Sequence, residues 1–401
     1  VRVEGVLFSD DSRHFLACLV ALGFTVEIEE EKKCVTVTGC GGRIPRGEAV
    51  IDVGSAGTAA RFLAAMLGFS DGCYEIRCSA QMKRRPMAEL FDLHSGAGAK
   101  ITFLEEEGHL PVRITGCRYA RADKTAGETP RELSLDITKS TQFLSALLLI
   151  APMVPEGMKI HITSEKTDGS YIRITRKMMQ EFGVSVAFDG RDYEVPCRSS
   201  YRKETYMVEP DMSAACYFYA AAAVTGGRAL VRHVHMDNTQ GDLRFLEVLE
   251  HMGCTADDTP EGVLVTGPAD GALRGITVNM NDFSDQALTL AAIAPFADAP
   301  VRIEGIGHIR GQECDRIHAI QTNLTALGIR CEEEETAATI YPGSPHGGNV
   351  ETYDDHRVAM AFSLIGLRTD GIVIENPACC RKTFEDYFTV LSELTGKKTE
   401  A

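Results

Sequence analysis

Residues 143–150 read Phe-Leu-Ser-Ala-Leu-Leu-Leu-Ile, and residues 217–224 read Tyr-Phe-Tyr-Ala-Ala-Ala-Ala-Val. Because both stretches are apolar on nearly every side, each predicts a helix that is buried inside a domain. A Ser or Asp that can cap the helix stands before each stretch. Segments of this kind begin near Ser55, Ser140, Asp211, Ser284 and Asp355.

A second kind of segment recurs between the buried helices: an amphipathic helix that ends at a glycine and is followed by a pair of strands. Glycine reaches the left-handed conformation that ends a helix without a side-chain clash. The pattern returns about every 70 to 85 residues, which indicates an internal repeat. An α/β protein with accidental spacing is the alternative. The closing glycines are Gly23, Gly98, Gly183, Gly253 and Gly328.

These segments predict six repeats, arranged as two domains of three. The first amphipathic helix, which ends at Gly23, has no buried helix before it, so we expect the N-terminal part of the first repeat to be missing. The stretch Asp-Asn-Thr-Gln-Gly-Asp at residues 237–242 has the composition of a linker. It predicts a first domain over residues 1–238 and a second over residues 239–401.

Composition excludes several classes of protein. The chain has 401 residues, of which 44% are hydrophobic and 24% charged, as in ordinary globular domains. A net charge of −16 opposes binding to nucleic acid or an anionic membrane. The longest apolar run, residues 143–154, is too short to span a bilayer. Thirteen cysteines without a C-x-x-C pair predict reduced thiols in a cytoplasm and no metal site.

Small polar residues stand at the starts of two buried helices. Unpaired N–H groups and the helix dipole make such starts suitable for anions. The stretches are Ser-Ala-Gly-Thr at 55–58 and Ser-Thr-Gln at 140–142. For the first stretch, a plain helix cap is the alternative interpretation.

Basic residues stand at comparable junctions. Met-Lys-Arg-Arg-Pro at 82–86 precedes a predicted helix, and a solvated basic turn is the default interpretation of such a run. Glu-Cys-Asp-Arg at 313–316 and Asp-His-Arg at 355–357 place arginines at helix starts, where a cation needs an anionic partner. Either the neighbouring carboxylates or a substrate anion could supply it.

The combination of motifs resembles the 5-enolpyruvylshikimate-3-phosphate (EPSP) synthase family over nearly the whole chain. The resemblance implies an α/β fold of two domains, described for the family as an inside-out α/β barrel with three βαβαββ units per domain and buried helices. The motifs are Ser-Ala-Gly-Thr (55–58), Lys-Arg-Arg-Pro (83–86), Ser-Thr-Gln-Phe-Leu (140–144), Ser-Tyr-Ile-Arg-Ile-Thr (170–175), Ser-Asp (284–285), Glu-Cys-Asp-Arg (313–316), Asp-Asp-His-Arg-Val-Ala-Met (354–360) and Lys-Thr-Phe (382–384).

The resemblance implies transfer of the carboxyvinyl group of phosphoenolpyruvate to the 5-hydroxyl of shikimate 3-phosphate, with release of phosphate. In this family the reaction proceeds by addition and elimination through a tetrahedral intermediate, without metal or organic cofactor, on the route to chorismate and the aromatic amino acids. The family also implies a cytoplasmic monomer. It gives no partner beyond the two small-molecule substrates.

Residue roles follow from the same resemblance. Asp285 and Glu313 match the carboxylates that handle the protons, with Lys382 and His356 grouped beside them as catalytic residues. The family's cations that hold phosphoenolpyruvate correspond to Arg85, Arg316, Arg357 and Lys382, so Lys382 has two roles. The resemblance places the loop of Ser55, Gly57 and Thr58 beside the same substrate. Residues matched to shikimate 3-phosphate are Ser140, Thr141, Gln142, Tyr171 and Gln312.

The chain also departs from the family pattern. Asp168 stands where a small hydroxyl usually contacts the substrate phosphate, Gln312 replaces a lysine, and His308 replaces an asparagine. Gly57, where some members have alanine, resembles the form that is sensitive to glyphosate. The family's Gly-Ser-Lys-Ser segment is absent, so we expect the chain to be inactive.

Two other functions remain open from the sequence. UDP-N-acetylglucosamine enolpyruvyl transferase shares the fold and the donor but uses a cysteine near the arginine that Arg85 matches, and no cysteine stands there. A non-catalytic or inactive truncated family member is the second alternative, because a substrate-binding lysine is missing.

Overall fold

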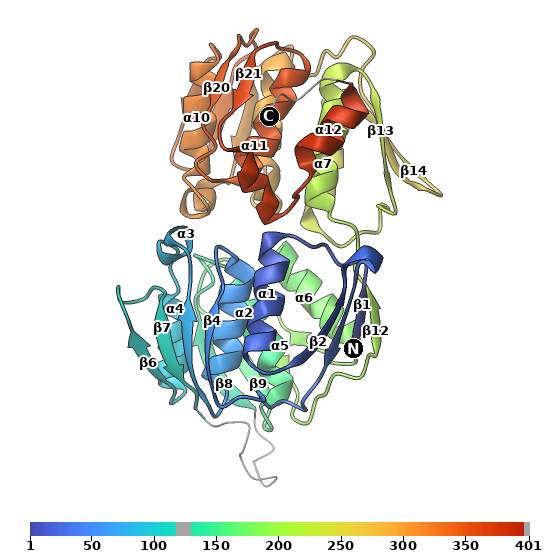
Figure 1. Ribbon diagram of the computed structural model, residues 1–401. Helices are drawn as coiled ribbons and strands as arrows, with labels where there is room; N and C mark the ends of the chain where they lie inside the picture. Colours follow the sequence, from blue (N-terminus) through green and yellow to red (C-terminus); the bar gives the residue numbers. More distant parts are fainter. Residues whose placement is uncertain (118–129, 397–401) are drawn as a thin grey trace. The chain divides into compact units, whose positions relative to one another are not determined.

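The chain forms two units, each with its own hydrophobic core. In the computed structural model, which describes residues 1–117 and 130–396, the units are Val1–Val208 and Glu209–Ala401 (Figure 1). The boundary predicted between residues 238 and 239 falls inside the second unit. The physical reason is packing, because α7 (Met212–Thr225) precedes that boundary and its side chains belong to the second unit's core.

Two complete βαβαββ repeats build most of the first unit. In each repeat the first two strands are parallel and flank a buried helix, and the last two strands are antiparallel. The sheet orders are β4-β5-β7-β6 and β10-β11-β9-β8. The elements are β4 (Glu48–Asp52), α2 (Gly57–Gly68), β5 (Cys73–Arg77), α3 (Ala80–Lys83), α4 (Ala88–Gly96), β6 (Lys100–Phe103) and β7 (Val112–Thr115), then β8 (Arg131–Leu135), α5 (Gln142–Ile150), β9 (Met158–Ile162), α6 (Ser170–Glu181), β10 (Ala187–Phe188) and β11 (Asp192–Val195).

The third sheet of the first unit is completed by a strand from much later in the chain. Its elements β1 (Arg2–Glu4), α1 (Asp10–Ala21), β2 (Thr25–Glu29) and β3 (Cys34–Thr38) form the second half of a repeat. The strand β12 (Thr205–Met207) pairs in parallel with β1 and occupies the place of the repeat's opening strand. The place of the opening strand in this sheet is therefore taken by β12, which the sequence pattern did not indicate. The buried helix expected before the first amphipathic helix has no counterpart among the described residues of this unit.

The second unit repeats the same plan with sheets of three, four and two strands. Their orders are β13-β15-β14, β16-β17-β19-β18 and β20-β21. The strands are β13 (Arg228–Arg232), β14 (Thr255–Thr259), β15 (Gly262–Thr266), β16 (Thr277–Asn279), β17 (Val301–Glu304), β18 (Cys331–Glu333), β19 (Ala338–Ile340), β20 (Gly348–Val350) and β21 (Ile372–Ile374). Besides α7, the helices are α8 (Phe245–His251), α9 (Ala287–Ile293), α10 (Arg316–Ala326), α11 (His356–Ser363) and α12 (Tyr387–Thr395).

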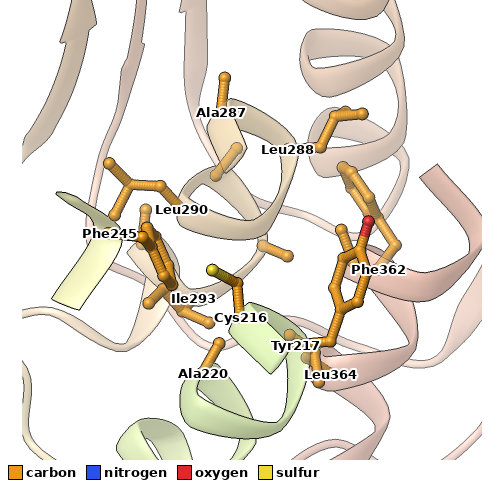
Figure 2. Close-up of a cluster of buried hydrophobic side chains, with 14 of the residues drawn as sticks. Cys216, Tyr217, Ala220, Phe245, Ala287, Leu288, Leu290, Ile293, Phe362 and Leu364 are labelled. Atoms are coloured by element: carbon orange, nitrogen blue, oxygen red, sulfur yellow. The ribbon is translucent and has the colours of Figure 1, made fainter. Parts of the chain in front are cut away.

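The helices predicted to be buried lie in the cores. Every residue of α9 is buried, and α7 and α11 both pack against it. Figure 2 shows side chains from these helices, such as Tyr217, Leu290 and Phe362, gathered into one apolar cluster. Burying each large apolar side chain contributes about 1.5–3 kcal/mol. The interior of the second unit is therefore organised by the three helices that the sequence marked as apolar all round.

The helix-closing glycines and the fold class also agree with the prediction. Gly23, Gly98, Gly183, Gly253 and Gly328 all have φ between 83° and 105°. The expected α/β fold of two domains with buried helices is confirmed, and within residues 1–117 and 130–396 the strands form separate open sheets and no closed barrel. No helix in those ranges is long and apolar enough to cross a membrane.

Candidate active site

The starts of the buried helices α2 and α5 are joined by hydrogen bonds in the first unit. Gln142, the first residue of α5, accepts a hydrogen bond from Arg61 Nη1 at 2.6 Å and donates one to Thr58 Oγ1 at 3.2 Å. The Arg61 guanidinium is buried and lies 5.5 Å from the centre of the Phe143 ring. The predicted residues Thr58 and Gln142 are therefore brought together, with Arg61 between them.

Gly57 allows two arginines to approach the start of α2. A Cβ atom at this position would lie 2.5 Å from Arg85 Nη1 and 3.0 Å from Arg61 Nη1, so a larger residue would displace a guanidinium. Ser55 Oγ, just before the helix, lies 2.7 Å from Ser79 Oγ. Two guanidinium groups beside the positive end of a helix dipole favour an anion.

The remaining predicted residues of the first unit lie at the starts of α5 and α6. Ser140 Oγ accepts a hydrogen bond from the backbone N–H of Gln142 at 3.3 Å, and Thr141 occupies the N-cap position of α5 without a side-chain capping bond. Tyr171 is 48% exposed on α6, so its ring is accessible to a ligand. Asp168 has a local partner, because its Oδ2 lies 2.9 Å from Arg173 Nη1.

Arg316 is the centre of the predicted site in the second unit. Its side chain is 1% exposed. Nε and Nη2 bind both oxygens of Asp355 at 2.7 Å and 3.2 Å, Nη1 lies 3.0 Å from Asp285 Oδ1, and Nη2 lies 2.9 Å from Glu313 Oε2. Nη1 also donates to Gln312 Oε1. Burial opposes the charge of Arg316, but the surrounding carboxylates hold its pKa above the usual value, so it remains a cation.

Each predicted catalytic carboxylate joins Arg316 to a second cation. Asp285 Oδ2 lies 3.1 Å from Arg357 Nη2, and Glu313 Oε1 lies 2.6 Å from Lys382 Nζ. Lys382 reaches the site from the end of the 3₁₀ helix η9 (Pro377–Lys382). The structure therefore brings together two carboxylates and three cations within the second unit.

Asp355 and His356 at the start of α11 are both buried. Burial would raise the pKa of Asp355, but the charge of Arg316 outweighs it and lowers that pKa. Burial lowers the pKa of His356 to about 3, so its imidazole is neutral at physiological pH. His356 Nδ1 lies 3.6 Å from Asp355 Oδ1. Ser284, which precedes Asp285 in the chain, has its Oγ 2.8 Å from His308 Nε2.

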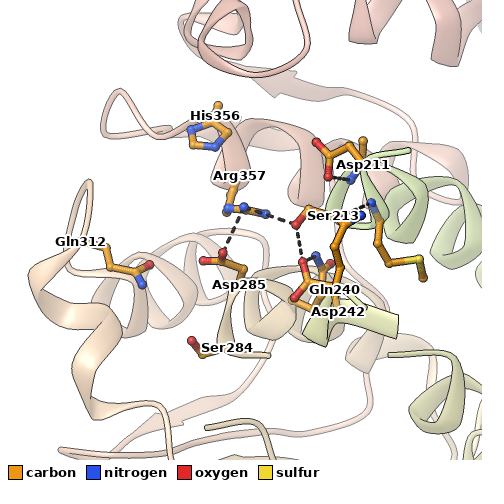
Figure 3. Close-up of polar contacts among 12 residues, drawn as sticks. Asp211, Ser213, Gln240, Asp242, Ser284, Asp285, Gln312, His356 and Arg357 are labelled. Carbon is orange, nitrogen blue, oxygen red and sulfur yellow. Dashed lines mark hydrogen bonds and ion pairs between the residues drawn. The ribbon is translucent and has the colours of Figure 1, made fainter. Parts of the chain in front are cut away.

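Sequence reasoning did not assign three residues that the structure places in these clusters. Arg61 stands one helical turn after Gly57, and Asp355 stands inside the motif at residues 354–360, so both could have been assigned from the sequence. Asp242 lies near Asp285 in Figure 3, and its Oδ2 accepts a hydrogen bond from Gln286 Nε2 at 3.0 Å. Asp242 lies in the stretch 237–242, which has the composition of a linker, so the sequence did not indicate a buried carboxylate there.

Comparison with known proteins agrees with the motifs. The model of the family described as EPSP synthase (3-phosphoshikimate 1-carboxyvinyltransferase) matches residues 1–391. The chain belongs to the EPSP synthase family. Among its relatives, the 3-phosphoshikimate 1-carboxyvinyltransferase of Trichormus variabilis is 40% identical over 396 residues, which cover 98% of this chain and 90% of that protein. The protein of the same name from Sulfurovum is 38% identical over 400 residues, covering 98% and 91%.

Solved structures show the same fold. EPSP synthase from Acinetobacter baumannii superposes with a TM-score of 0.78 at 24% identity, covering 98% of this chain and 89% of that chain. The enolpyruvyl transferase NikO from Streptomyces tendae superposes with a TM-score of 0.68 at 17% identity. The expectation that the chain is inactive finds no support in these comparisons, since its EPSP synthase relatives align along nearly all of it.

Proposed function

We propose that this chain transfers the carboxyvinyl group of phosphoenolpyruvate to the 5-hydroxyl of shikimate 3-phosphate and releases phosphate. The observation that carries the proposal is the EPSP synthase family match over residues 1–391. The cluster of carboxylates and cations around Arg316 supports it, because the reaction needs proton transfer next to a donor that carries both a carboxylate and a phosphate.

Asp285 is suited to take the proton of the 5-hydroxyl. As a carboxylate bound by Arg316 and Arg357, it is an acceptor and is held in one orientation. In the addition step the hydroxyl oxygen forms a bond to C2 of phosphoenolpyruvate, Asp285 receives the hydroxyl proton, and C3 gains a proton to become a methyl group. The product of this step is a tetrahedral phosphate adduct.

Glu313 and Lys382 are suited to the proton transfers at C3. Their side chains are 2.6 Å apart, so a proton held by the pair can pass to C3 and be removed again. In the elimination step C3 loses a proton, the C2=C3 double bond re-forms, and the C2–O bond to phosphate breaks. The proton that C3 gained returns to the Glu313–Lys382 pair, and the hydroxyl proton held by Asp285 passes to the departing phosphate. The overall reaction is therefore balanced without a redox cofactor.

The arginines are suited to hold the donor. Planar guanidinium groups match the carboxylate and phosphate of phosphoenolpyruvate, which supports this role for Arg85, Arg316 and Arg357. We assign Ser55, Gly57 and Thr58 to the same substrate, and we assign His356, which is neutral and buried, to the support of this cluster.

Shikimate 3-phosphate is assigned to the starts of α5 and α6. Ser140, Thr141 and Gln142 offer hydrogen-bond donors and acceptors there, and the exposed ring of Tyr171 offers an apolar surface for the substrate ring. Gln312 is assigned to the same substrate on the resemblance alone, since its amide is bound to Arg316 in this structure.

We also place the protein in the cytoplasm as a monomer. Thirteen cysteines without a disulfide between them support a reducing compartment. The glycine at position 57 supports sensitivity to glyphosate, which would compete with phosphoenolpyruvate.

The test is the release of phosphate from phosphoenolpyruvate with two alternative acceptors. Release that depends on shikimate 3-phosphate is the expected result. Release that depends on UDP-N-acetylglucosamine would support the other enolpyruvyl transferase, and release with neither acceptor would support a non-catalytic member. The variant Asp285→Asn should abolish release in the same assay, which excludes a contaminating phosphatase.

A further inference from the structure

Asp242 is a buried carboxylate that lies beside the predicted catalytic cluster without belonging to it. It stands in the 3₁₀ helix η4 (Gly241–Arg244) and is 7% exposed. Its Oδ2 atom accepts a hydrogen bond from Ser213 Oγ (Figure 3) and another from Gln286 Nε2. Gln286 is fully buried and directly follows Asp285 in the chain.

Ser213 connects Asp242 to Arg357. Arg357 Nη2 donates to Ser213 Oγ at 3.5 Å and lies 3.1 Å from Asp285 Oδ2 (Figure 3). A serine hydroxyl carries only one proton. When Ser213 donates that proton to Asp242, its oxygen lone pairs are left to accept from Arg357, whose guanidinium is only a donor.

We propose that Asp242 is a positioning residue that acts through Ser213 to hold the Arg357 guanidinium beside Asp285, and that this link sets the affinity of the site for phosphoenolpyruvate. The inference rests on the proposed function, because it takes Arg357 as a ligand of that substrate. Asp242 itself touches neither the substrate nor a reacting atom in this scheme.

The link is expected to respond to pH. Burial and the nearby charge of Asp285 raise the pKa of Asp242 to about 6, against the opposing effects of Arg357, Ser213 and Gln286. The thiol of Cys216 on α7 also lies beside it, since Sγ is 3.6 Å from the backbone carbonyl of Asp242. On its own element, Arg244 lies toward Glu247 and Asp282 at 3.9 Å and 3.7 Å.

The direction of the response follows from hydrogen-bond chemistry. Above about pH 6 Asp242 is ionised and holds the Ser213 proton. Below that pH the carboxyl of Asp242 is neutral and is a weaker acceptor, so the Ser213 hydroxyl hydrogen can turn toward Arg357. The Ser213 O–H and the Arg357 N–H are then both donors, and they repel each other. We therefore expect the affinity for phosphoenolpyruvate to fall as the pH drops through about 6.

Steady-state kinetics of Asp242→Asn and Ser213→Ala test the link. Each variant should raise the KM for phosphoenolpyruvate about tenfold while kcat changes less, which is the effect of losing one charge-assisted hydrogen bond. The acid-side rise of KM in the unmodified protein should be absent in both. The double variant should resemble either single variant, because both changes remove the same interaction.

Asp258→Asn is the matched control. It also converts a carboxylate to an amide, but Asp258 pairs with His235 on the surface of the same unit. It should keep the original KM and its pH profile. Additive effects of Asp242→Asn and Ser213→Ala on the KM would overturn the inference. So would a KM and a pH profile of KM that Asp242→Asn leaves unchanged.

A spectroscopic measurement separates this inference from the proposed function. The side-chain ¹⁵N–¹H signals of Arg357, assigned by their loss in Arg357→Lys, should titrate near pH 6 and should not do so in Asp242→Asn. This result is independent of turnover. Its failure in a protein that releases phosphate normally would overturn the link alone, whereas absence of phosphate release would count against the proposed function alone.

Discussion

Glu313 and Lys382, which are far apart in the sequence, form a direct pair in which Nζ lies 2.6 Å from Oε1. The other Glu313 oxygen lies 2.9 Å from Arg316 Nη2, so the carboxylate is fixed on both sides. Asp285 is fixed in the same way by Arg316 and Arg357. Two carboxylates that share one buried arginine can act at different atoms of the same reaction.

The first prediction concerns this pair. Glu313→Gln keeps the shape of the side chain but cannot exchange a proton with C3 of phosphoenolpyruvate. We expect kcat for phosphate release to fall about 10²–10⁴-fold, the usual contribution of a general acid–base group, with a smaller change in KM. A variant that kept kcat and lost only affinity would contradict the role of Glu313 in proton transfer.

The second prediction concerns the stability of the second unit. Arg316→Met leaves three carboxylates without their shared cation in a buried position. Breaking a buried ion pair in this way costs about 3–5 kcal/mol in the free energy of unfolding. Urea unfolding measures the change. The control Arg232→Met removes an exposed arginine that lies 3.9 Å from Glu261, and it should change stability by less than about 1 kcal/mol.

The third prediction concerns His94 in α4 and the pH dependence of stability. Burial lowers its pKa to about 3, and its ring packs edge-on against Phe69 at 5.2 Å. Because the folded pKa lies below the unfolded value of about 6.5, the unfolded state binds the extra proton, and stability falls as the pH drops below that value.

His94→Leu removes this titration. Relative to the variant, the unmodified protein should lose about 2 kcal/mol of unfolding free energy between about pH 7 and pH 5. Urea unfolding of both proteins at the two pH values gives the difference. A stability difference that is the same at both pH values would mean that His94 is accessible to protons in the folded state.

The fourth prediction concerns glyphosate. We expect inhibition that phosphoenolpyruvate relieves by competition. In Gly57→Ala the added Cβ would lie 2.5 Å from Arg85 Nη1, so the guanidinium must move. The inhibition constant for glyphosate should then rise more than the KM for phosphoenolpyruvate, since the inhibitor is longer than the substrate. Inhibition that does not depend on phosphoenolpyruvate concentration would contradict the competition.

The buried helices could be predicted from the sequence because their signal is local. The run Phe143–Ile150 has no polar face, so it could only lie in a core, and the glycine after each amphipathic helix marks where that helix ends. The motif resemblance then pointed to Asp285 and Glu313, two of the three carboxylates that bind Arg316. These features depend on residues that are close together in the chain.

The features that could not be predicted depend on contacts between distant segments. The pairing of β12 with β1 joins residues about 200 positions apart, and a three-residue strand carries no sign of its partner. The stretch around Asp242 resembled a linker because it is polar and contains Gly241. Only the fold shows that its carboxylate is buried against Ser213 and Gln286.

The central claim is that the C2–O bond of phosphoenolpyruvate breaks. The most direct test uses phosphoenolpyruvate carrying ¹⁸O at the oxygen that bridges C2 and phosphorus, with shikimate 3-phosphate as the acceptor. Mass spectrometry of both products follows the label. We predict that the released phosphate contains the ¹⁸O and that the organic product gains the carboxyvinyl mass without it. Label retained in pyruvate, with phosphate free of ¹⁸O, would show cleavage of the P–O bond and contradict the account.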